Sequence, residues 1–343
     1  MTAAGPGRPE RVVVIGAGTM GARIAVFFAR AGRTVCLASR RQETLDAASA
    51  TIHSVLAEAP GCASGPAARQ PRQDGESPGE VLSRIRLTTD AGADLGAADL
   101  VVETIREDLG DKIALLSQVG SRVRPEALVT TNTSSLDLAA LAEAVPHPGR
   151  FAGLHWFNPA DLVELVEVVP APATAPGIVE TLRAWLAGLG KAPVVARRAV
   201  PGFVANRLQY ALLREAYALV AAGVCTLGDA DLAVVAGLGP RWAAIGPFQS
   251  MDIAGLDVHL AVTRALFGDL ATGAAPPDLL AGLVDAGHLG VKSGRGLLGD
   301  YPPDRQESVT RIRDAMLRTI PLVREEAASQ HLAEGGTREG PQP

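Results

Sequence analysis

RVVVIGAGTMG, residues 11–21, is the stretch that decides the fold. Its first five residues, rich in valine and isoleucine, predict a short buried strand. A helical pattern follows from about residue 19 to residue 31, where Gly32 closes it, and TVCLA at 34–38 predicts a second strand. GAGTMG at 16–21 fits the pattern GxGxxG, which is weak evidence alone but specific between a strand and a helix. The stretch therefore predicts the start of a βαβ unit.

This glycine pattern predicts a dinucleotide site. Glycines permit a tight turn and a close approach of a pyrophosphate to the first turn of the helix, whose free N–H groups and dipole favour negative charge. The alternative, a chance glycine-rich turn, is disfavoured by the βαβ context. The cofactor contacts predicted here are Gly16, Gly18, Thr19, Met20 and Gly21.

The end of the second predicted strand carries Ser39, Arg40 and Arg41. A site for NAD usually has Asp or Glu at this point, hydrogen-bonded to the 2′-OH of the ribose. A carboxylate repels the 2′-phosphate of NADP, whereas a hydroxyl and guanidinium groups bind it. We therefore expect NAD(P) as cofactor, with NADP favoured over NAD. The alternative for the arginines is a solvated helix start.

Strand candidates alternate with helical patterns along the first 200 residues or so, which predicts a mostly parallel, doubly wound sheet. From about residue 201 the pattern is helical throughout. The predicted fold class is an α/β Rossmann-like N-terminal domain followed by an all-α C-terminal domain. The later strand candidates are IRLTT (85–89), LVVET (100–104), LVTTN (128–132), RFAGLHW (150–156) and LVELVEVV (162–169).

The expected domains follow from these patterns. Residues 1–199 form the NAD(P)-binding domain, interrupted by a flexible Gly/Pro-rich insertion at 59–80. Residues 200–326 form a helical domain, and residues 327–343 a disordered tail.

Composition narrows the function classes. The 343 residues are 47% hydrophobic with a net charge of -5, which indicates a globular protein and argues against a nucleic-acid partner. The three cysteines are far apart and have no Cys/His spacing, so we expect no metal and reduced thiols in the cytoplasm. No apolar run is long enough for a membrane span.

Seven segments resemble, in order, the 3-hydroxyacyl-CoA dehydrogenase family. The resemblance spans about residues 11–300. It implies a Rossmann-like domain, a helical domain that carries a homodimer contact, and oxidation of an L-3-hydroxyacyl thioester to its 3-oxo form, or the reverse. The matching segments are VIGAGTMG (14–21), VVETIREDLGDK (101–112), TNTSSL (131–136), FAGLHWFNP (151–159), LVEVV (165–169), VPGFVANRL (200–208) and GPFQSMDIAGLD (246–257).

The segment GLHWFNPADLVELVEV at 153–168 carries the predicted catalytic pair, His155 and Glu167. Oxidation of a secondary alcohol requires removal of the hydroxyl proton, and a histidine that titrates near neutrality suits that transfer. A carboxylate on the other ring nitrogen fixes the tautomer and stabilises the imidazolium. The family motif selects Glu167 over Glu164, which would face the other way on a strand. The alternative, a satisfied core histidine, is disfavoured by the motif.

Supporting residues are implied by the resemblance. Ser134 and Asn158 match residues that hydrogen-bond the substrate oxygen, and Asn206 matches a helical-domain asparagine that points into the cleft. Polar groups suit an oxygen that gains negative charge on reduction. The alternative for Ser134 and Asn206 is ordinary capping or turn bonding. Cofactor contacts are implied for Glu107, Lys112 and Asn132, with exposed helix charges as the alternative for the first two.

Two departures from the family pattern leave the substrate open. The Gly/Pro-rich stretch 59–80 replaces the basic CoA-binding arm of the better-known members. GLGPRWAAIGPF at 237–248 is similar instead to relatives that act on small polar alcohols, such as L-gulonate 3-dehydrogenase and carnitine dehydrogenase. Arg241 there meets a substrate carboxylate or is an exposed helix-end residue.

The expected partner is a small-molecule substrate. An acyl-CoA or acyl carrier protein thioester comes first, and a small polar 3-hydroxy acid second. A crystallin-like or cofactor-sensing protein on the same fold is the alternative of another class.

Overall fold

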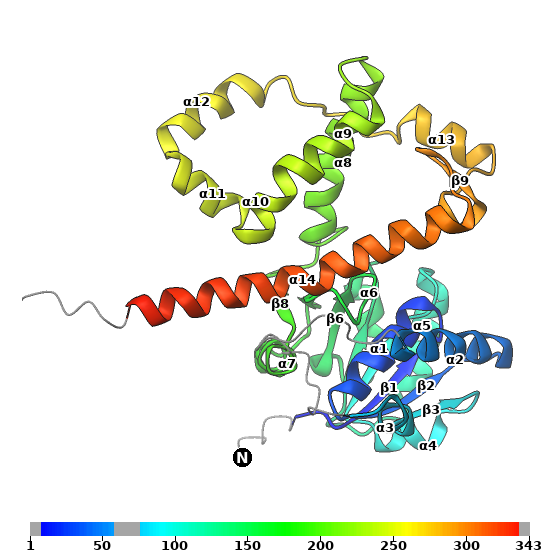
Figure 1. The fold of residues 1–343 in the computed structure, drawn as a ribbon. Coiled ribbons are helices and arrows are strands. Elements are labelled where there is room, and N and C mark those ends of the chain that lie inside the picture. Colours follow the sequence, from blue (N-terminus) through cyan, green and yellow to red (C-terminus); the bar gives the residue numbers. More distant parts are fainter. Residues whose placement is uncertain (1–7, 58–75, 336–343) are drawn as a thin grey trace, which may run out of the picture. The chain divides into compact units, whose positions relative to one another are not determined.

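The computed structural model describes residues 8–57 and 76–335. The chain divides into two compact units, residues 1–206 and residues 207–343. The first is an α/β unit and the second is almost entirely helical, as the sequence predicts. Figure 1 shows both units.

The N-terminal unit is built on an eight-stranded sheet with the order β3-β2-β1-β4-β5-β6-β7-β8. Strands β1 to β6 pair in parallel, β7 runs antiparallel to β6, and β8 runs parallel to β7. The sheet is therefore mostly parallel, as expected, although the sequence analysis did not predict β8. The strands are β1 Arg11–Ile15, β2 Thr34–Ala38, β3 Ile85–Thr88, β4 Leu100–Glu103, β5 Leu128–Thr131, β6 Phe151–Trp156, β7 Leu165–Pro170 and β8 Ala192–Val195.

Helices cover both faces of this sheet (Figure 1). Val12 and Val14 of β1 lie in one apolar core with residues of α1 (Thr19–Arg30), α2 (Gln42–Ala57), α3 (Pro78–Ser83) and α7 (Pro176–Gly188). Val13 lies in a second core with α4 (Gly92–Ala97), α5 (Leu109–Gly120) and α6 (Leu138–Glu143). Because successive side chains of a strand point to opposite faces, a continuous valine run suits a strand buried on both sides. A 3₁₀ turn, Pro148–Arg150, precedes β6.

The segment 59–80, expected to be flexible, lies outside the described residues up to position 75. Its last residues differ from that expectation, because α3 begins at Pro78. Ser77 caps this helix: its hydroxyl accepts a hydrogen bond from the N–H of Glu80, whose carboxylate accepts one from the N–H of Ser77. Such a reciprocal capping box starts a helix even beside a Gly/Pro-rich stretch.

The C-terminal unit contains helices, a π-helical turn, a 3₁₀ turn and one short hairpin, which the sequence analysis did not predict. Its larger apolar side chains include Phe248, 85% exposed, and Ile253, 73% exposed. The elements are α8 Ala205–Ala221, α9 Leu227–Ala233, the π-helical turn Val234–Leu238, α10 Gly239–Ala244, α11 Pro247–Ala254, α12 Leu256–Leu266, α13 Asp278–Asp285, the 3₁₀ turn Val291–Ser293, β9 Arg295–Gly296, β10 Gly299–Asp300 and α14 Pro303–Gly335.

Two boundaries differ from the predicted domain limits. The first compact unit continues beyond residue 199 to Asn206, because Phe203 is buried in its core and the next two backbone N–H groups bind Glu167. Helix α14 continues to Gly335, into the segment 327–343 that was expected to be disordered. Alanine, glutamate and leucine in that segment are strong helix formers, which explains the extension. Residues 336–343 lie outside the described residues.

None of the helices that the structure describes combines the length and the apolar character that a membrane crossing requires.

Candidate active site

The glycine-rich turn after β1 is enforced by packing at two of its three glycines. Gly16 has φ 113°, and a Cβ added there would lie 2.4 Å from the carbonyl oxygen of Thr104. A Cβ on Gly21 would lie 1.8 Å from the carbonyl oxygen of Gly16. These two positions therefore require glycine for the turn and for the close approach of α1.

Gly18 is different, because a Cβ added there would have no neighbour within 4 Å among the described residues. It is the N-cap residue of α1 and makes no side-chain cap bond, so the first backbone N–H groups of the helix, which begins at Thr19, have no side-chain cap. Within the part of the chain that the structure describes, no contact requires glycine here. Room for a close-lying pyrophosphate explains it, and the turn fits a dinucleotide.

The end of β2 carries no carboxylate. Ser39 follows the strand, donates its backbone N–H to the carbonyl of Thr88, and accepts a hydrogen bond on its hydroxyl from the N–H of Arg41. Arg40 and Arg41 are exposed. The three predicted residues thus follow the carboxyl end of a strand next to β1, the side of such sheets at which nucleotides bind.

His155 and Glu167 form a buried pair on neighbouring strands. They are directly opposite each other in the antiparallel register of β6 and β7, and the distance from Nδ1 to Oε2 is 2.7 Å. All residues of β6 are buried, and Glu167 is fully buried. Glu164 precedes β7 and acts electrostatically on Lys191 instead. The structure thus brings together the two residues that the sequence analysis paired.

The second oxygen of Glu167 is also bound. Oε1 accepts hydrogen bonds from the backbone N–H groups of Val204, at 2.9 Å, and Ala205, at 2.8 Å, where α8 begins. Burial raises the pKa of this carboxyl, but the hydrogen bonds from His155, Ala205 and Val204 outweigh it and lower the pKa overall. Glu167 is therefore an ionised acceptor, and Nδ1 of His155 must carry the proton that it accepts.

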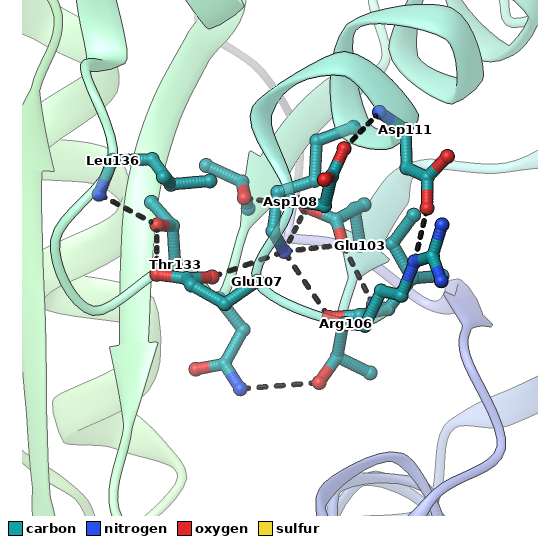
Figure 2. A network of polar contacts seen from close by, with 12 residues as sticks. Glu103, Arg106, Glu107, Asp108, Asp111, Thr133 and Leu136 are labelled. Atoms are coloured by element: carbon teal, nitrogen blue, oxygen red, sulfur yellow. Dashed lines mark hydrogen bonds and ion pairs between the residues drawn. The ribbon is translucent and has the colours of Figure 1, made fainter.

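Ser134 lies on the other side of the imidazole. Its Oγ is 3.1 Å from Nε2 of His155, and it belongs to a turn after β5 that Glu107 organises. Oε1 of Glu107 accepts from the hydroxyl of Thr133 and from the N–H groups of Ser134 and Ser135, at 2.5, 2.8 and 3.2 Å. Figure 2 shows Glu107 reaching from the β4–α5 connection to Thr133.

Lys112 is buried behind Glu107. Its Nζ donates to both carboxylate oxygens of Glu103, at 2.7 and 2.9 Å, and lies 3.6 Å from Oε2 of Glu107. Thr131 donates to the same Glu103 carboxylate at 2.5 Å. Lys112 is fully buried, whereas the side chain of Glu107 is 38% exposed. Of the two residues expected to contact the cofactor, only Glu107 has exposed surface.

The structure places the remaining predicted residues as follows. Asn132 links the residue after β4 to the end of β6, since its Nδ2 donates to the hydroxyl of Thr104 and its Oδ1 accepts from the N–H of Trp156. Asn158 is exposed, three residues after His155. The other two are half-buried Asn206, second in α8, and exposed Arg241 of α10, whose Nε donates to the carbonyl of Gly237 in its own unit.

Sequence reasoning missed Glu103 and Thr133. Glu103 is the last residue of β4, where an isolated carboxylate in an apolar strand was a usable signal. Thr133 gave no such signal, because threonines are common in turns and its partner Glu107 is 26 residues away. Among the residues that the structure describes, no three His, Cys, Asp or Glu side chains gather as a metal site would require.

Comparison with known proteins agrees with this architecture. A model of the 3-hydroxyacyl-CoA dehydrogenase NAD binding domain matches residues 11–199, and a model of the C-terminal domain of the same family matches residues 202–299. The chain is 32% identical, over 91% of its length and 97% of the relative's, to 5-formyl-3-hydroxy-2-methylpyridine 4-carboxylate 5-dehydrogenase of Mesorhizobium japonicum. It is 38% identical to the mitochondrial hydroxyacyl-coenzyme A dehydrogenase of Sus scrofa, over 72% of this chain and 77% of that one.

A solved structure gives the same result. The crystal structure of a 5-formyl-3-hydroxy-2-methylpyridine 4-carboxylic acid 5-dehydrogenase, called an NAD+ dependent dismutase, superimposes with a TM-score of 0.80 at 30% identity. The match covers 92% of this chain and 98% of that one. The chain therefore belongs to the 3-hydroxyacyl-CoA dehydrogenase family, as a dehydrogenase with a Rossmann-like, NAD-binding domain followed by a helical domain.

Proposed function

We propose that this chain transfers a hydride between NAD(P) and the C3 hydroxyl or oxo group of a 3-hydroxyacyl thioester, with His155 as the proton-transfer residue. The observation that carries the proposal is the line of contacts from Ser134 Oγ through both nitrogens of His155 to Glu167. A histidine bound in this way has one nitrogen committed to a carboxylate and the other available for a substrate hydroxyl.

In oxidation, the hydroxyl proton moves to Nε2 of His155 while the C3 hydrogen leaves as a hydride, and the C–O single bond becomes a carbonyl. NAD(P), when bound, supplies the hydride acceptor, or the donor in the reverse reaction. The imidazolium formed at His155 is 2.7 Å from the ionised Glu167, which stabilises it in a buried, low-dielectric setting.

Two further side chains serve the substrate oxygen in this proposal. The hydroxyl of Ser134, 3.1 Å from Nε2, is positioned to hydrogen-bond the same oxygen that His155 protonates or deprotonates. Asn158, exposed just beyond β6, supplies an amide donor for the carbonyl as it gains negative charge. Asn206 is proposed for the same region because it lies one residue after the backbone that binds Glu167.

The turn at Gly16 to Gly21 holds the cofactor pyrophosphate in this proposal, and Ser39, Arg40 and Arg41 hold the adenosine ribose. We propose NADP over NAD, since the end of β2 offers a hydroxyl and two exposed guanidinium groups and no carboxylate. We also propose a homodimer through the C-terminal unit, which light scattering on the purified protein tests. The support is its exposed apolar side chains, among them Phe248, Ile253 and Leu256.

A second candidate substrate is a small polar hydroxy acid or aldehyde bearing a carboxylate. The observation that favours it is the match to the Mesorhizobium pyridine-carboxylate dehydrogenase, which covers 97% of that relative. Arg241 is exposed, and a guanidinium group of this kind pairs well with a carboxylate.

The test is a substrate panel run with both cofactors and followed at 340 nm. Reduction of acetoacetyl-CoA supports the thioester assignment, and turnover of acetoacetyl carrier protein alone moves it to carrier-bound substrates. Turnover restricted to gulonate, carnitine or a pyridine carboxylate establishes the second candidate instead. Cofactor binding without turnover on any of these would favour a crystallin-like or sensing role on the same fold.

A further inference from the structure

The connection between β6 and β7, residues 157–164, joins the two strands that carry His155 and Glu167 and includes Asn158. It contains two short local hydrogen bonds, from the N–H groups of Leu162 and Val163 to the carbonyl of Pro159, at 3.0 and 2.9 Å. The carbonyl of Glu164, at its end, accepts a hydrogen bond from the N–H of Ala192 in β8, at 2.8 Å, and the side chains of Lys191 and of arginines on α1 approach the connection as well.

Lys191, immediately before β8, is the first of these side chains. It is 7% exposed, and its Nζ donates to the carbonyls of Ala160 and Val163, both at 2.7 Å. The same Nζ lies 4.3 Å from the ring centroid of Phe27. Two backbone carbonyls of the connection are thus bound by one buried amine, and they belong to residues on either side of Asp161.

Asp161 is the second point of attachment. Its carboxylate is 1% exposed, and Oδ1 is 2.5 Å from Nη1 of Arg23 on α1. Nη1 of Arg30, also on α1, lies 3.7 Å from Oδ2. Arg23 is four residues after Thr19, where α1 begins beside the glycine-rich turn. The connection is therefore held between the nucleotide-binding helix and the residue that leads into β8.

Burying a lysine and this ion pair costs desolvation free energy, which an apolar core would avoid. Buried charged groups can hold a segment in one particular geometry. Here they bind the segment that contains Asn158, the residue proposed to hydrogen-bond the substrate oxygen. We propose that Lys191 and Asp161 are positioning residues, which hold the 157–164 connection so that Asn158 meets the substrate oxygen at His155. The proposal rests on the proposed function for the role of Asn158, but not for the attachment itself.

Hydrogen exchange tests the attachment without any substrate. In Lys191→Met, peptides that cover 157–164 should exchange at least ~10-fold faster, while peptides from α1 and α5 keep the wild-type rate. Arg183→Met, which removes an exposed cation paired with Glu180 on α7, is the matched control and should leave 157–164 unchanged. Asp161→Asn keeps the shape of the side chain and provides a second variant if Lys191→Met does not fold.

A double-mutant cycle tests the functional link. Lys191→Met should lower kcat/KM for the best substrate of the panel by ~10- to 100-fold and leave the Kd of the reduced cofactor, measured by fluorescence, within about twofold. In an Asn158→Ala background the same substitution should have little further effect, because both act through one contact. A general loss of structure would instead add its full effect to that of Asn158→Ala.

The outcomes separate the two hypotheses. Unchanged exchange at 157–164 overturns the proposal whatever the substrate, and so do additive effects of Lys191→Met and Asn158→Ala. If Asn158→Ala alone leaves kcat/KM at the wild-type value, the role of Asn158 in the proposed function fails, and with it the positioning role. Faster exchange together with non-additive kinetics supports the proposal.

Discussion

His155 and Glu167 are partners in the antiparallel register of β6 and β7, so the 2.7 Å contact between Nδ1 and Oε2 is a cross-strand pair. Residues opposite each other on one face of a sheet approach closely without any help from flexible loops. A shift of one residue in the register would turn Glu167 to the other face and break the pair. The geometry of the His155–Glu167 pair is therefore as rigid as the sheet that carries it.

Glu167→Gln tests the importance of this pair. The amide oxygen can still accept from Val204 and Ala205, but the amide NH₂ then faces Nδ1 of His155 and favours the other tautomer. Nε2 would then carry a hydrogen and lose its basicity toward the substrate. We expect kcat to fall by ~10²–10⁴, with KM for the cofactor nearly constant. Steady-state kinetics at 340 nm measures both.

His155→Gln is the companion variant, and its kcat should fall within the same ~10²–10⁴ range. The double variant should be little worse than either single variant, because the two residues act as one unit. Wild-type turnover by either single variant would remove the pair from the mechanism.

The glycine-rich turn, the strands and the His155–Glu167 pair could be predicted from the sequence because their sequence signals are local. The GxGxxG turn, the strand periodicity and the choice of Glu167 over Glu164 each depend on residues close together in the chain. Residues bound across long separations were not found this way. Lys191 contacts backbone carbonyls about 30 residues earlier, and a carbonyl leaves no mark on the sequence. Strand β8 was not predicted either. It is an edge strand in which exposed and partly buried residues alternate.

The glycine-rich turn allows a sharp contrast between two alanine substitutions. Gly21→Ala places a Cβ 1.8 Å from the backbone oxygen of Gly16, so the turn must shift and we expect a loss of ~2–4 kcal/mol in the free energy of unfolding. Gly18→Ala meets no atom of the described residues within 4 Å and should change stability by less than about 0.5 kcal/mol.

The affinity for the cofactor should respond to Gly18→Ala although the stability does not. Gly18→Ala is expected to weaken NADH and NADPH binding at least ~10-fold, because its methyl group occupies the space proposed for the pyrophosphate. Urea denaturation and fluorescence titration of the cofactor provide the two measurements. If Gly18→Ala lowered the free energy of unfolding by as much as it weakened the free energy of cofactor binding, the open space at this position would be contradicted.

Glu107 is predicted to act through the turn that carries Ser134. Its Oε1 accepts from Thr133, Ser134 and Ser135, so Glu107→Ala releases three donors at once. We expect kcat to fall by ~10- to 100-fold, since Ser134 is no longer held at His155. Glu107→Gln keeps an oxygen acceptor and is the matched control, with most of the activity retained. A change confined to KM for the cofactor in both variants would assign Glu107 to cofactor binding alone.

Cofactor choice is expected to depend on the end of β2. The ratio of kcat/KM for NADPH over NADH should exceed one in the wild type. Ser39→Asp introduces the carboxylate that NAD sites use for the ribose 2′-OH, and should lower this ratio at least ~10-fold through repulsion of the 2′-phosphate. Ser39→Asn, of similar size and uncharged, separates charge from volume. A wild-type ratio well below one would refute the preference for NADP.

Lys191 makes the stability of the fold depend on pH in a specific direction. Burial lowers the pKa of its amine from 10.5 to about 7, although Asp161 and Glu164 oppose that shift. Between about pH 7 and pH 10.5 the unfolded chain therefore binds a proton that the folded chain has released, and the free energy of unfolding rises with pH. A shift of this size corresponds to about 5 kcal/mol at most. The hydrogen bonds to Ala160 and Val163 persist in this range, because a neutral amine still has two donors.

Urea denaturation of wild type and Lys191→Met at pH 6.5 to 9.5 measures this dependence. The difference in the free energy of unfolding, wild type minus variant, should increase by a few kcal/mol across that range, because the variant has no proton to release. Arg183→Met should keep a constant difference from the wild type, since its guanidinium group stays charged throughout. A constant difference for Lys191→Met as well would mean that Lys191 remains an ammonium ion when buried. Asp161 and Glu164 would then compensate its desolvation in full, and the segment 157–164 would be held by charge as well as by hydrogen bonds.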